Sequence, residues 1–238
     1  MSTAIRESVT ILRGRRRLSG ELSYQADADP AFAALVIGPH PYMGGTMRNA
    51  LVTAIAGTLA EAGGLSLRFD YGGTGLSEGP RIDVAASMSA FWETGHAPED
   101  PDRLEDALAA FDFLDSLAVH PRILVGYSFG ASAAWRLACR ESATLAGVAL
   151  ISPTLSRHPF PATRPPRARR LLVIHSTDDF CTAESAVAEW VRSLPAGVEY
   201  SRHVGGNHFF RGAEHRIGQE VAEFITLRCR SSPEVAAC

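Results

Sequence analysis

The sequence predicts an α/β fold in which helices cover both faces of a mostly parallel sheet. Short apolar runs alternate with segments of helical period along almost the whole chain, an order typical of parallel βαβ units. Several runs are apolar throughout, such as residues 31–37, which indicates strands buried on both faces. A glycine-bounded serine at residues 126–130 joins one run directly to a helical segment. Functional side chains in such sheets follow the carboxyl ends of strands, so candidates are expected there.

The composition indicates a globular protein without a strong electrostatic bias. The chain has 238 residues, which fits a single domain over 1–238 with a sizeable core. Hydrophobic residues make up 46% and charged residues 21%, and the net charge of −3 gives no global attraction to nucleic acid or an anionic membrane. All 23 basic residues are arginine, which excludes lysine chemistry such as Schiff-base formation.

The cysteines and the N-terminus bear on location and partners. The four cysteines, Cys139, Cys181, Cys229 and Cys238, show neither metal-ligand spacing nor a disulfide framework. Residues 1–6 carry no apolar signal core, and no apolar run reaches membrane-spanning length. We therefore expect a cytoplasmic protein that acts on a small molecule, with no cofactor, no metal, no nucleic-acid partner and no membrane partner. A homodimer is left open.

The first elements of the chain predict an edge hairpin followed by buried strands. Residues 8–12 and 18–24 alternate apolar and polar side chains, which is typical of a β-hairpin. The arginines between them are interpreted as a solvated hairpin tip. Further strands are expected at the apolar runs, at residues 31–37, 65–69, 123–125, 148–151, 171–175 and 197–204.

Helices are expected between these strands wherever apolar residues recur with helical period. Leu51, Ile55 and Leu59 share one helix face, and Gly63 with Gly64 ends that segment. The same reasoning predicts helices at residues 47–62, 103–118, 128–140, 183–194 and 213–228. Residues 152–170 show no period, and the tail from Ser231 is expected to fray.

One long insertion, residues 78–102, interrupts this alternation. A short amphipathic helix is expected over 84–92, where it would carry Phe91 and Trp92. Connections of this length are usually functional lids or disordered segments, and the aromatic pair favours a lid. A surface excursion with its own small apolar cluster stays an alternative.

Ser128 is the candidate nucleophile. A turn between strand and helix as tight as Gly126–Gly130 brings two backbones so close that a Cβ at either glycine would clash. Such a nucleophile elbow holds the serine in a strained conformation with its hydroxyl above the sheet. The alternative is a glycine-rich turn with an ordinary exposed serine.

A serine hydroxyl needs a general base, and the base needs an acid. Among eight histidines, His208 follows the last predicted strand in a glycine-containing loop, which makes it the expected base. The strand at 171–175 leads into Asp178 and Asp179, and either carboxylate could be the acid. The other would then cap the next helix.

The remaining site residues are expected to hold the oxyanion and the substrate. One oxyanion donor should be the N–H of Phe129, at the start of the elbow helix. The other should come from the loop after residues 31–37, where Pro39 and Pro41 lack an N–H and leave Tyr42 and Met43. The expected pocket residues are aromatic or lie in this loop: His40, Met43, Phe91, Trp92, Phe160, Phe180 and Phe209.

These motifs resemble the α/β-hydrolase superfamily over essentially the full length of the chain. The elbow matches, and residues 69–77 are similar to the D-x-x-G-x-G-x-S loop of the family. His40-Pro41-Tyr42 stands where many members have His-Gly-x, which by this resemblance places the Tyr42 N–H in the oxyanion hole. The family spacing H-G-x-x-D implies Asp179 as the acid, in the chain order serine, acid, histidine.

Residues 40–48 resemble a stretch of small dienelactone-hydrolase-like and esterase-like members. Such members often have a cysteine nucleophile, whereas this chain has Ser128, so lactone specificity does not carry over. The leading hypothesis is a serine hydrolase that cleaves an ester or thioester, and the aromatic candidates for the pocket suggest an apolar acyl or polyketide-like substrate. Two alternatives stay open: a lyase on the same fold, which would eliminate a carboxylate from an esterified biosynthetic intermediate, and a non-catalytic binding protein.

Overall fold

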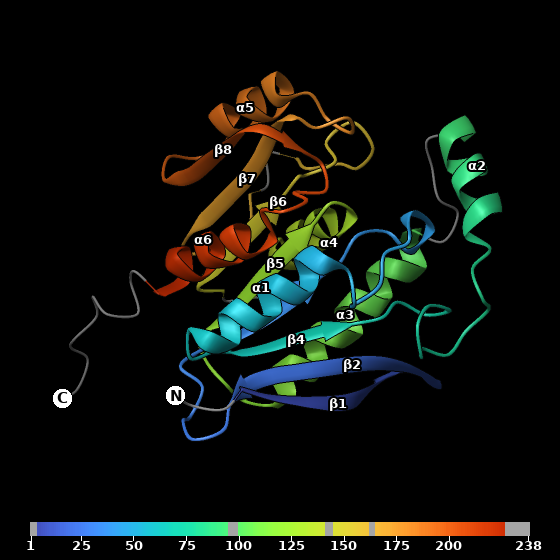
Figure 1. Ribbon diagram of the computed structural model, residues 1–238, viewed down its shortest axis with the longest axis vertical. Helices are drawn as coiled ribbons and strands as arrows, with labels where there is room; N and C mark the ends of the chain where they lie inside the picture. The colour runs from blue at the N-terminus through green and yellow to red at the C-terminus, as the bar shows by residue number, and fades with distance from the viewer. Residues whose placement is uncertain (1–3, 95–99, 141–144, 162–164, 227–238) are drawn as a thin grey trace.

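The computed structural model describes residues 4–94, 100–140, 145–161 and 165–226. Over these residues, eight strands form one sheet in the order β1-β2-β4-β3-β5-β6-β7-β8 (Figure 1). The pairings β1–β2 and β2–β4 are antiparallel and all others are parallel, which confirms the predicted fold class. The strands are β1 (Ala4–Arg13), β2 (Arg16–Gln25), β3 (Ala33–Ile37), β4 (Leu65–Phe69), β5 (Arg122–Tyr127), β6 (Gly147–Ile151), β7 (Leu171–Asp178) and β8 (Val198–Asn207).

The helices lie where the apolar period predicted them, with ends shifted by a few residues. Helix α1 begins at Ala50 rather than Met47, because the Asn49 side chain caps it by accepting from the N–H groups of Leu51 and Val52. No helix in the described part of the chain combines the length and apolar content needed to cross a membrane. The helices are η1 (Pro41–Met43), α1 (Ala50–Glu61), α2 (Val84–Thr94), α3 (Asp100–Ser116), α4 (Phe129–Ala138), α5 (Glu184–Ser193) and α6 (Glu214–Thr226). The tail from Ser231 lies outside the described residues.

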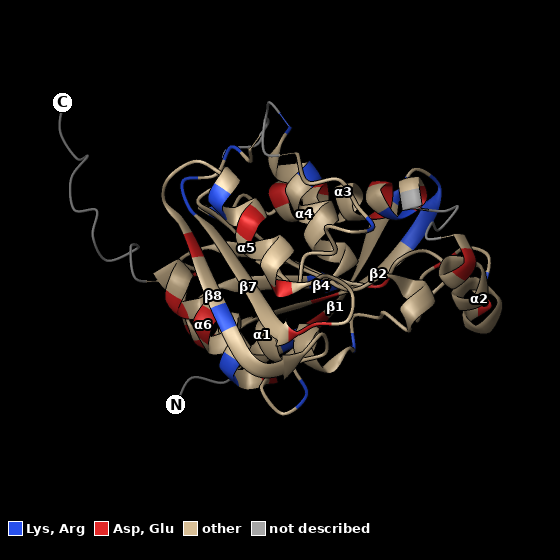
Figure 2. Cartoon of the chain, turned by 90° about the horizontal axis from the view of Figure 1, so that it is seen from above, with Lys and Arg blue, Asp and Glu red and all other residues tan. Residues whose placement is uncertain are grey.

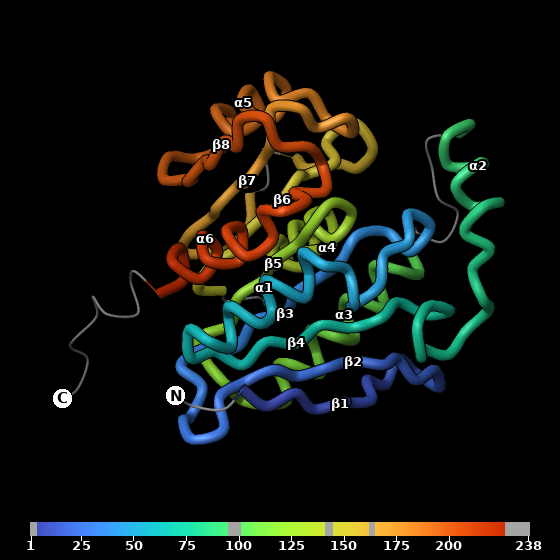
Figure 3. Tube along the Cα trace, in the orientation of Figure 1, coloured from blue at the N-terminus to red at the C-terminus, as the bar shows by residue number. Residues whose placement is uncertain are grey.

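Alternate residues of the central strands face two separate apolar layers. Leu35 of β3 packs in the layer that holds buried residues of α3, α4 and α5, whereas Val36 packs in the layer of α1 and α6. Figure 3 shows α1 and α6 on one side of the sheet and α3 and α4 on the other. Because both faces of β3 are covered, every residue of that strand is buried, which explains its continuous apolar run.

Helix α2 forms within the insertion, as the sequence predicts, but it stands apart from the body. None of its side chains is buried. Of the other helices and strands, it packs mainly against η1, and Figures 1 and 2 both show it at an outer edge of the molecule. The insertion therefore adds a helix beside the carboxyl ends of the strands rather than a further part of the core.

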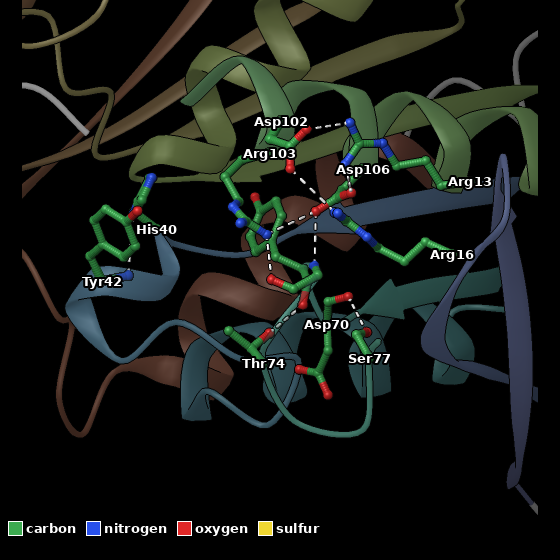
Figure 4. Close-up of polar contacts among 12 residues, drawn as sticks. Arg13, Arg16, His40, Tyr42, Asp70, Thr74, Ser77, Asp102, Arg103 and Asp106 are labelled. Atoms are coloured by element: carbon green, nitrogen blue, oxygen red, sulfur yellow. Dashed lines mark hydrogen bonds and ion pairs between the residues drawn. The ribbon is translucent and has the colours of Figure 1, made fainter. Parts of the chain in front are cut away.

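The arginines of the β1–β2 hairpin are paired with helix α3, so the interpretation as a solvated tip was wrong for Arg13 and Arg16. Arg13 donates to Asp102 at 2.6 Å and to Asp106 at 2.7 Å, and Arg16 donates to Asp102 at 3.2 Å (Figure 4). The hydrogen bond from Arg13 lowers the pKa of Asp102 to about 2. The acidic residues near the start of α3 lie beside the hairpin in space but far from it in the chain. Local sequence therefore does not indicate that they pair with the hairpin arginines.

Asp106 joins three parts of the fold at one buried carboxylate. Its side chain is fully buried and accepts from Arg13, from Arg103 at 3.1 Å and from the Gly72 N–H at 2.8 Å. Arg103 also donates to the Gly72 carbonyl. The hairpin, helix α3 and the loop after β4 therefore share one charged centre.

We predict that Asp106→Asn destabilises the protein by about 3 kcal/mol, because it leaves two guanidinium groups facing a neutral amide in a buried site. Urea unfolding would measure the loss. Asp112→Asn changes an exposed carboxylate on the same helix and should stay within about 0.5 kcal/mol of the parent protein. Equal stabilities for the two variants would contradict this account of Asp106.

Candidate active site

The turn between β5 and α4 holds Ser128 in a strained conformation. Ser128 has φ 58° and ψ −117°, a region that side-chain-bearing residues rarely adopt. Its N–H donates to the Ile151 carbonyl of the neighbouring strand at 2.9 Å, and only 9% of the residue is exposed. The predicted nucleophile thus sits at the carboxyl end of a central strand, fixed by the sheet.

The two elbow glycines are required by close backbone approach. A Cβ on Gly126 would lie 2.2 Å from the Gly130 carbonyl oxygen, and a Cβ on Gly130 would lie 2.1 Å from the Ile37 carbonyl oxygen. Both distances are far inside van der Waals contact. The steric reason inferred from the sequence is therefore present in the structure, where α4 passes directly over β3 and β5.

His208 lies between Ser128 and Asp179. Its Nδ1 is 2.8 Å from Asp179 Oδ2, and its Nε2 is 2.9 Å from Ser128 Oγ. A carboxylate accepts only, so Nδ1 carries a proton, and in the neutral form of the ring Nε2 accepts from the serine hydroxyl. The structure brings together the predicted serine and histidine with one of the two candidate acids. Asp178, the other candidate, is exposed at the end of β7.

Asp179 is held by its own loop. Its Oδ1 accepts from the N–H groups of Cys181 at 2.8 Å and Thr182 at 3.3 Å, which leaves Oδ2 for His208. A second histidine, His175, is fully buried and bonds through Nε2 to the Thr182 carbonyl at 3.0 Å. Burial lowers the pKa of His175, so we take it as the neutral ring that donates to this loop.

Opposing effects set the pKa values of the acid and the base. Burial alone would lower the pKa of His208, but the hydrogen bonds and charges of Asp179 and Cys181 outweigh it and raise that pKa to about 9. Burial alone would raise the pKa of Asp179, but the hydrogen bond and charge of His208 outweigh it and keep that pKa below its ordinary value. The charged pair is therefore favoured.

The residues predicted to hold the oxyanion belong to two elements, α4 and η1. The Phe129 amide is at the first position of α4, where N–H groups have no partner within the helix. The Tyr42 amide instead donates to His40 Nδ1 at 3.2 Å, as Figure 4 shows, and the Met43 amide donates to the His40 carbonyl at 3.0 Å. In this arrangement both amides of the η1 loop are engaged, and the assignment of Tyr42 stays a prediction.

A pocket opens above Ser128 and contains most of the predicted substrate-binding residues: His40, Met43, Phe91, Trp92, Phe180 and Phe209. Phe160 is the exception. Its ring packs against Trp135 at 5.7 Å and Trp190 at 5.5 Å between centroids, and only 7% of the residue is exposed. The pocket assignment of Phe160 is therefore corrected to a core role, because the loop after β6 turns back onto α4 and α5 at that residue.

Several lining residues were missed by sequence reasoning: Pro39, Asn49, Tyr127, Thr154, Arg157, His158 and Cys181. Most of them lie at or just after the ends of strands, the one signal that could have found them. Thr154, Arg157 and His158 belong to the segment after β6, for which the sequence shows no period. The Nδ1 of His158 lies 2.8 Å from Thr154 Oγ1, and its ring meets that of Phe129 at 5.2 Å.

A serine on a strand-to-helix turn, bonded through histidine to a carboxylate at the edge of a parallel sheet, defines the α/β class of serine hydrolases. The model of the alpha/beta hydrolase family matches residues 89–229. The chain belongs to this family, which confirms the resemblance found in the sequence.

Similar proteins span nearly the whole chain. An uncharacterized protein of Rickettsia prowazekii is 24% identical over 218 residues, which are 88% of this chain and 84% of the relative. A crystal structure from Agrobacterium tumefaciens, of a protein of unknown function, is 26% identical with a TM-score of 0.78 and covers 96% of this chain and 100% of its own. A serine hydrolase of Xanthomonas campestris described as without lid is 21% identical with a TM-score of 0.75, covering 96% and 97%.

We predict that Gly130→Ala destabilises the protein by about 2 kcal/mol or more, since the new methyl group meets the Ile37 carbonyl and the turn must open. Thermal unfolding would report the change. The matched control is Gly57→Ala in α1, where a Cβ meets open space and should stabilise the helix by about 0.5–1 kcal/mol. Similar effects at the two glycines would contradict the steric account.

The raised pKa of His208 predicts alkaline activity. Only the unprotonated ring can accept the serine proton, so kcat/KM for a neutral ester should fall as the pH drops through about 9. Cys181→Ser should move this limb to lower pH, because Cys181 helps to raise the pKa of His208.

Cys139→Ser is the control for that shift, since Cys139 directly follows α4 and does not line the pocket. It should leave the pH profile in place. A profile whose acid limb lies near pH 6 in all three proteins would show that Cys181 and Asp179 do not set the pKa of His208.

Proposed function

We propose that this protein hydrolyses an ester or thioester of an apolar acyl or polyketide-like substrate through an acyl-enzyme on Ser128. One observation carries the proposal: the chain of two hydrogen bonds, 2.9 Å and 2.8 Å, from Ser128 Oγ through His208 to Asp179. This arrangement supplies a nucleophile, a base and a group that stabilises the charged base. The aromatic lining of the pocket supports an apolar substrate.

The reaction would proceed in two stages. Ser128 Oγ attacks the carbonyl carbon while His208 Nε2 takes the hydroxyl proton, and Asp179 stabilises the resulting imidazolium. His208 then gives that proton to the departing alcohol or thiol as the carbon–oxygen or carbon–sulfur bond breaks. A water molecule, activated by His208, attacks the acyl-enzyme and releases the acid and free Ser128.

The developing oxyanion would be stabilised by backbone donors. The Phe129 N–H is adjacent to the attacking oxygen and belongs to the N-terminal turn of α4, whose dipole favours negative charge. The Tyr42 N–H would act as the second donor by exchanging its bond to His40 Nδ1 for one to the substrate oxygen. His40 would then orient the loop rather than transfer a proton.

The insertion at 78–102 would act as a lid. Phe91 and Trp92 of α2 are in the pocket lining, although no side chain of that helix is buried. Closure of these two rings over a bound acyl chain would exclude water and strengthen the electrostatic interactions around Ser128.

A fluorophosphonate probe tests the assembled site. We predict labelling of Ser128 in the parent protein, with loss of labelling and at least a thousandfold loss of kcat in Ser128→Ala and His208→Ala. His215→Ala alters an exposed histidine of α6 and should retain both. Intact-protein and peptide mass spectrometry would locate the label, and a folded but unlabelled parent protein would contradict the proposal.

Product analysis in heavy-oxygen water separates hydrolysis from elimination. Hydrolysis transfers solvent oxygen to the released acid, because water resolves the acyl-enzyme. A product free of solvent oxygen, made by a Ser128→Ala variant that stays active, would instead assign the site to a lyase.

A further inference from the structure

The walls of the pocket carry positive charge in a protein whose net charge is −3. Among the described residues that line the pocket there is no aspartate and no glutamate, whereas the cationic side chain of Arg157 is present. Asp179 bonds to His208 and is not among the lining residues. The charge of this wall is therefore opposite in sign to that of the chain as a whole, which favours an anion in the pocket.

Arg157 presents its guanidinium group at the side of the pocket that faces α2. Its backbone N–H donates to the Thr154 carbonyl at 2.9 Å, which anchors the loop, and its side chain is exposed. The guanidinium carbon lies 5.3 Å from the centre of the Phe91 ring, a cation–π contact that orients the group without using its N–H donors.

Arg157 also differs from several arginines elsewhere in the structure. Arg13, Arg68 and Arg103 are paired with carboxylates. Within the described part of the chain, no carboxylate forms an ion pair with Arg157. A planar group with five N–H donors, oriented and unpaired at the wall of an apolar pocket, is suited to bind a carboxylate through two parallel hydrogen bonds.

We propose that the substrate is an ester or thioester that also bears a carboxylate, and that Arg157 binds this carboxylate. The apolar part of the substrate would lie against Phe91, Trp92 and Phe180, with the scissile carbonyl at Ser128. This inference rests on the proposed hydrolase function and narrows its substrate class to anionic esters. Arg157 would then determine specificity, because a neutral ester of the same shape leaves its donors without a partner.

Two pairs of esters test the proposal and locate the carboxylate. The first pair is mono-4-nitrophenyl adipate and 4-nitrophenyl hexanoate, which differ by a carboxylate at the end of the acyl chain. The second is 4-carboxyphenyl butyrate and 4-carbamoylphenyl butyrate, which differ by a carboxylate on the leaving group. Rates of enzyme-free hydrolysis are subtracted for each. The ratio of kcat/KM for the charged ester to that for its neutral partner is measured for every variant.

We expect the parent protein to prefer the charged member of one pair by about tenfold or more. Arg157→Gln should lower that ratio by roughly tenfold to a hundredfold, mainly through KM, and Arg157→Lys should restore part of it. The matched control is Arg211→Gln. Arg211 lies over the Phe209 ring at 5.4 Å but does not line the pocket, so the parent ratio should be retained. High salt should weaken the preference.

The outcomes separate the two proposals. Suppose that the probe labels Ser128 and neutral esters are hydrolysed, but both kcat/KM ratios are the same in Arg157→Gln as in the parent protein. The inference about Arg157 is then wrong and the hydrolase proposal stands. An equal fall in Arg211→Gln would likewise overturn it, because the effect would then reflect general surface charge. If Ser128 is not labelled and no ester is cleaved, the hydrolase proposal fails and this inference fails with it.

Discussion

The passage of the backbone from β5 to α4 is the constraint on which the site depends. Ser128 adopts a positive φ because the helix must begin directly above the strand, and this is possible only where Gly126 and Gly130 have no side chain. A hydrogen bond from the Ser128 N–H to the Ile151 carbonyl of the neighbouring strand offsets part of the backbone strain at Ser128. The position of the hydroxyl is thus set by the central sheet, whereas the acid and the base lie in the loops after β7 and β8.

Most of the fold follows from patterns that local sequence carries. The continuous apolar run of β3 reflects two covered faces, and the regular spacing of Leu51, Ile55 and Leu59 reflects the single buried side of α1. What could not be predicted depends on partners distant in the chain. Arg13 and Asp106 are separated by more than a third of the sequence, so nothing near either residue indicates that they form one buried ion pair.

The candidate site was predictable to the degree that its residues follow strand ends. Ser128, His208 and the two aspartates all follow strand ends. Which aspartate bonds to His208 depends on the direction of the loop backbone, which turns the Asp179 carboxylate inward and which composition does not encode. The same limit explains why Phe160 was assigned to the pocket and Arg157 was not. Both lie in an aperiodic segment, where an aromatic residue can pack inward on Trp135 and a charged residue can face the pocket.

Helix α2 gains almost nothing from burial by itself, since all its side chains contact solvent. Its aromatic residues lack a hydrophobic partner large enough to cover them: Trp92 is 52% exposed. A molecule bound between these rings and the strand ends would provide that missing apolar surface, and the rings would be buried against it. Ligand affinity and the stability of this helix would then be linked. Mass action requires that a ligand which binds one conformation more tightly also stabilises that conformation.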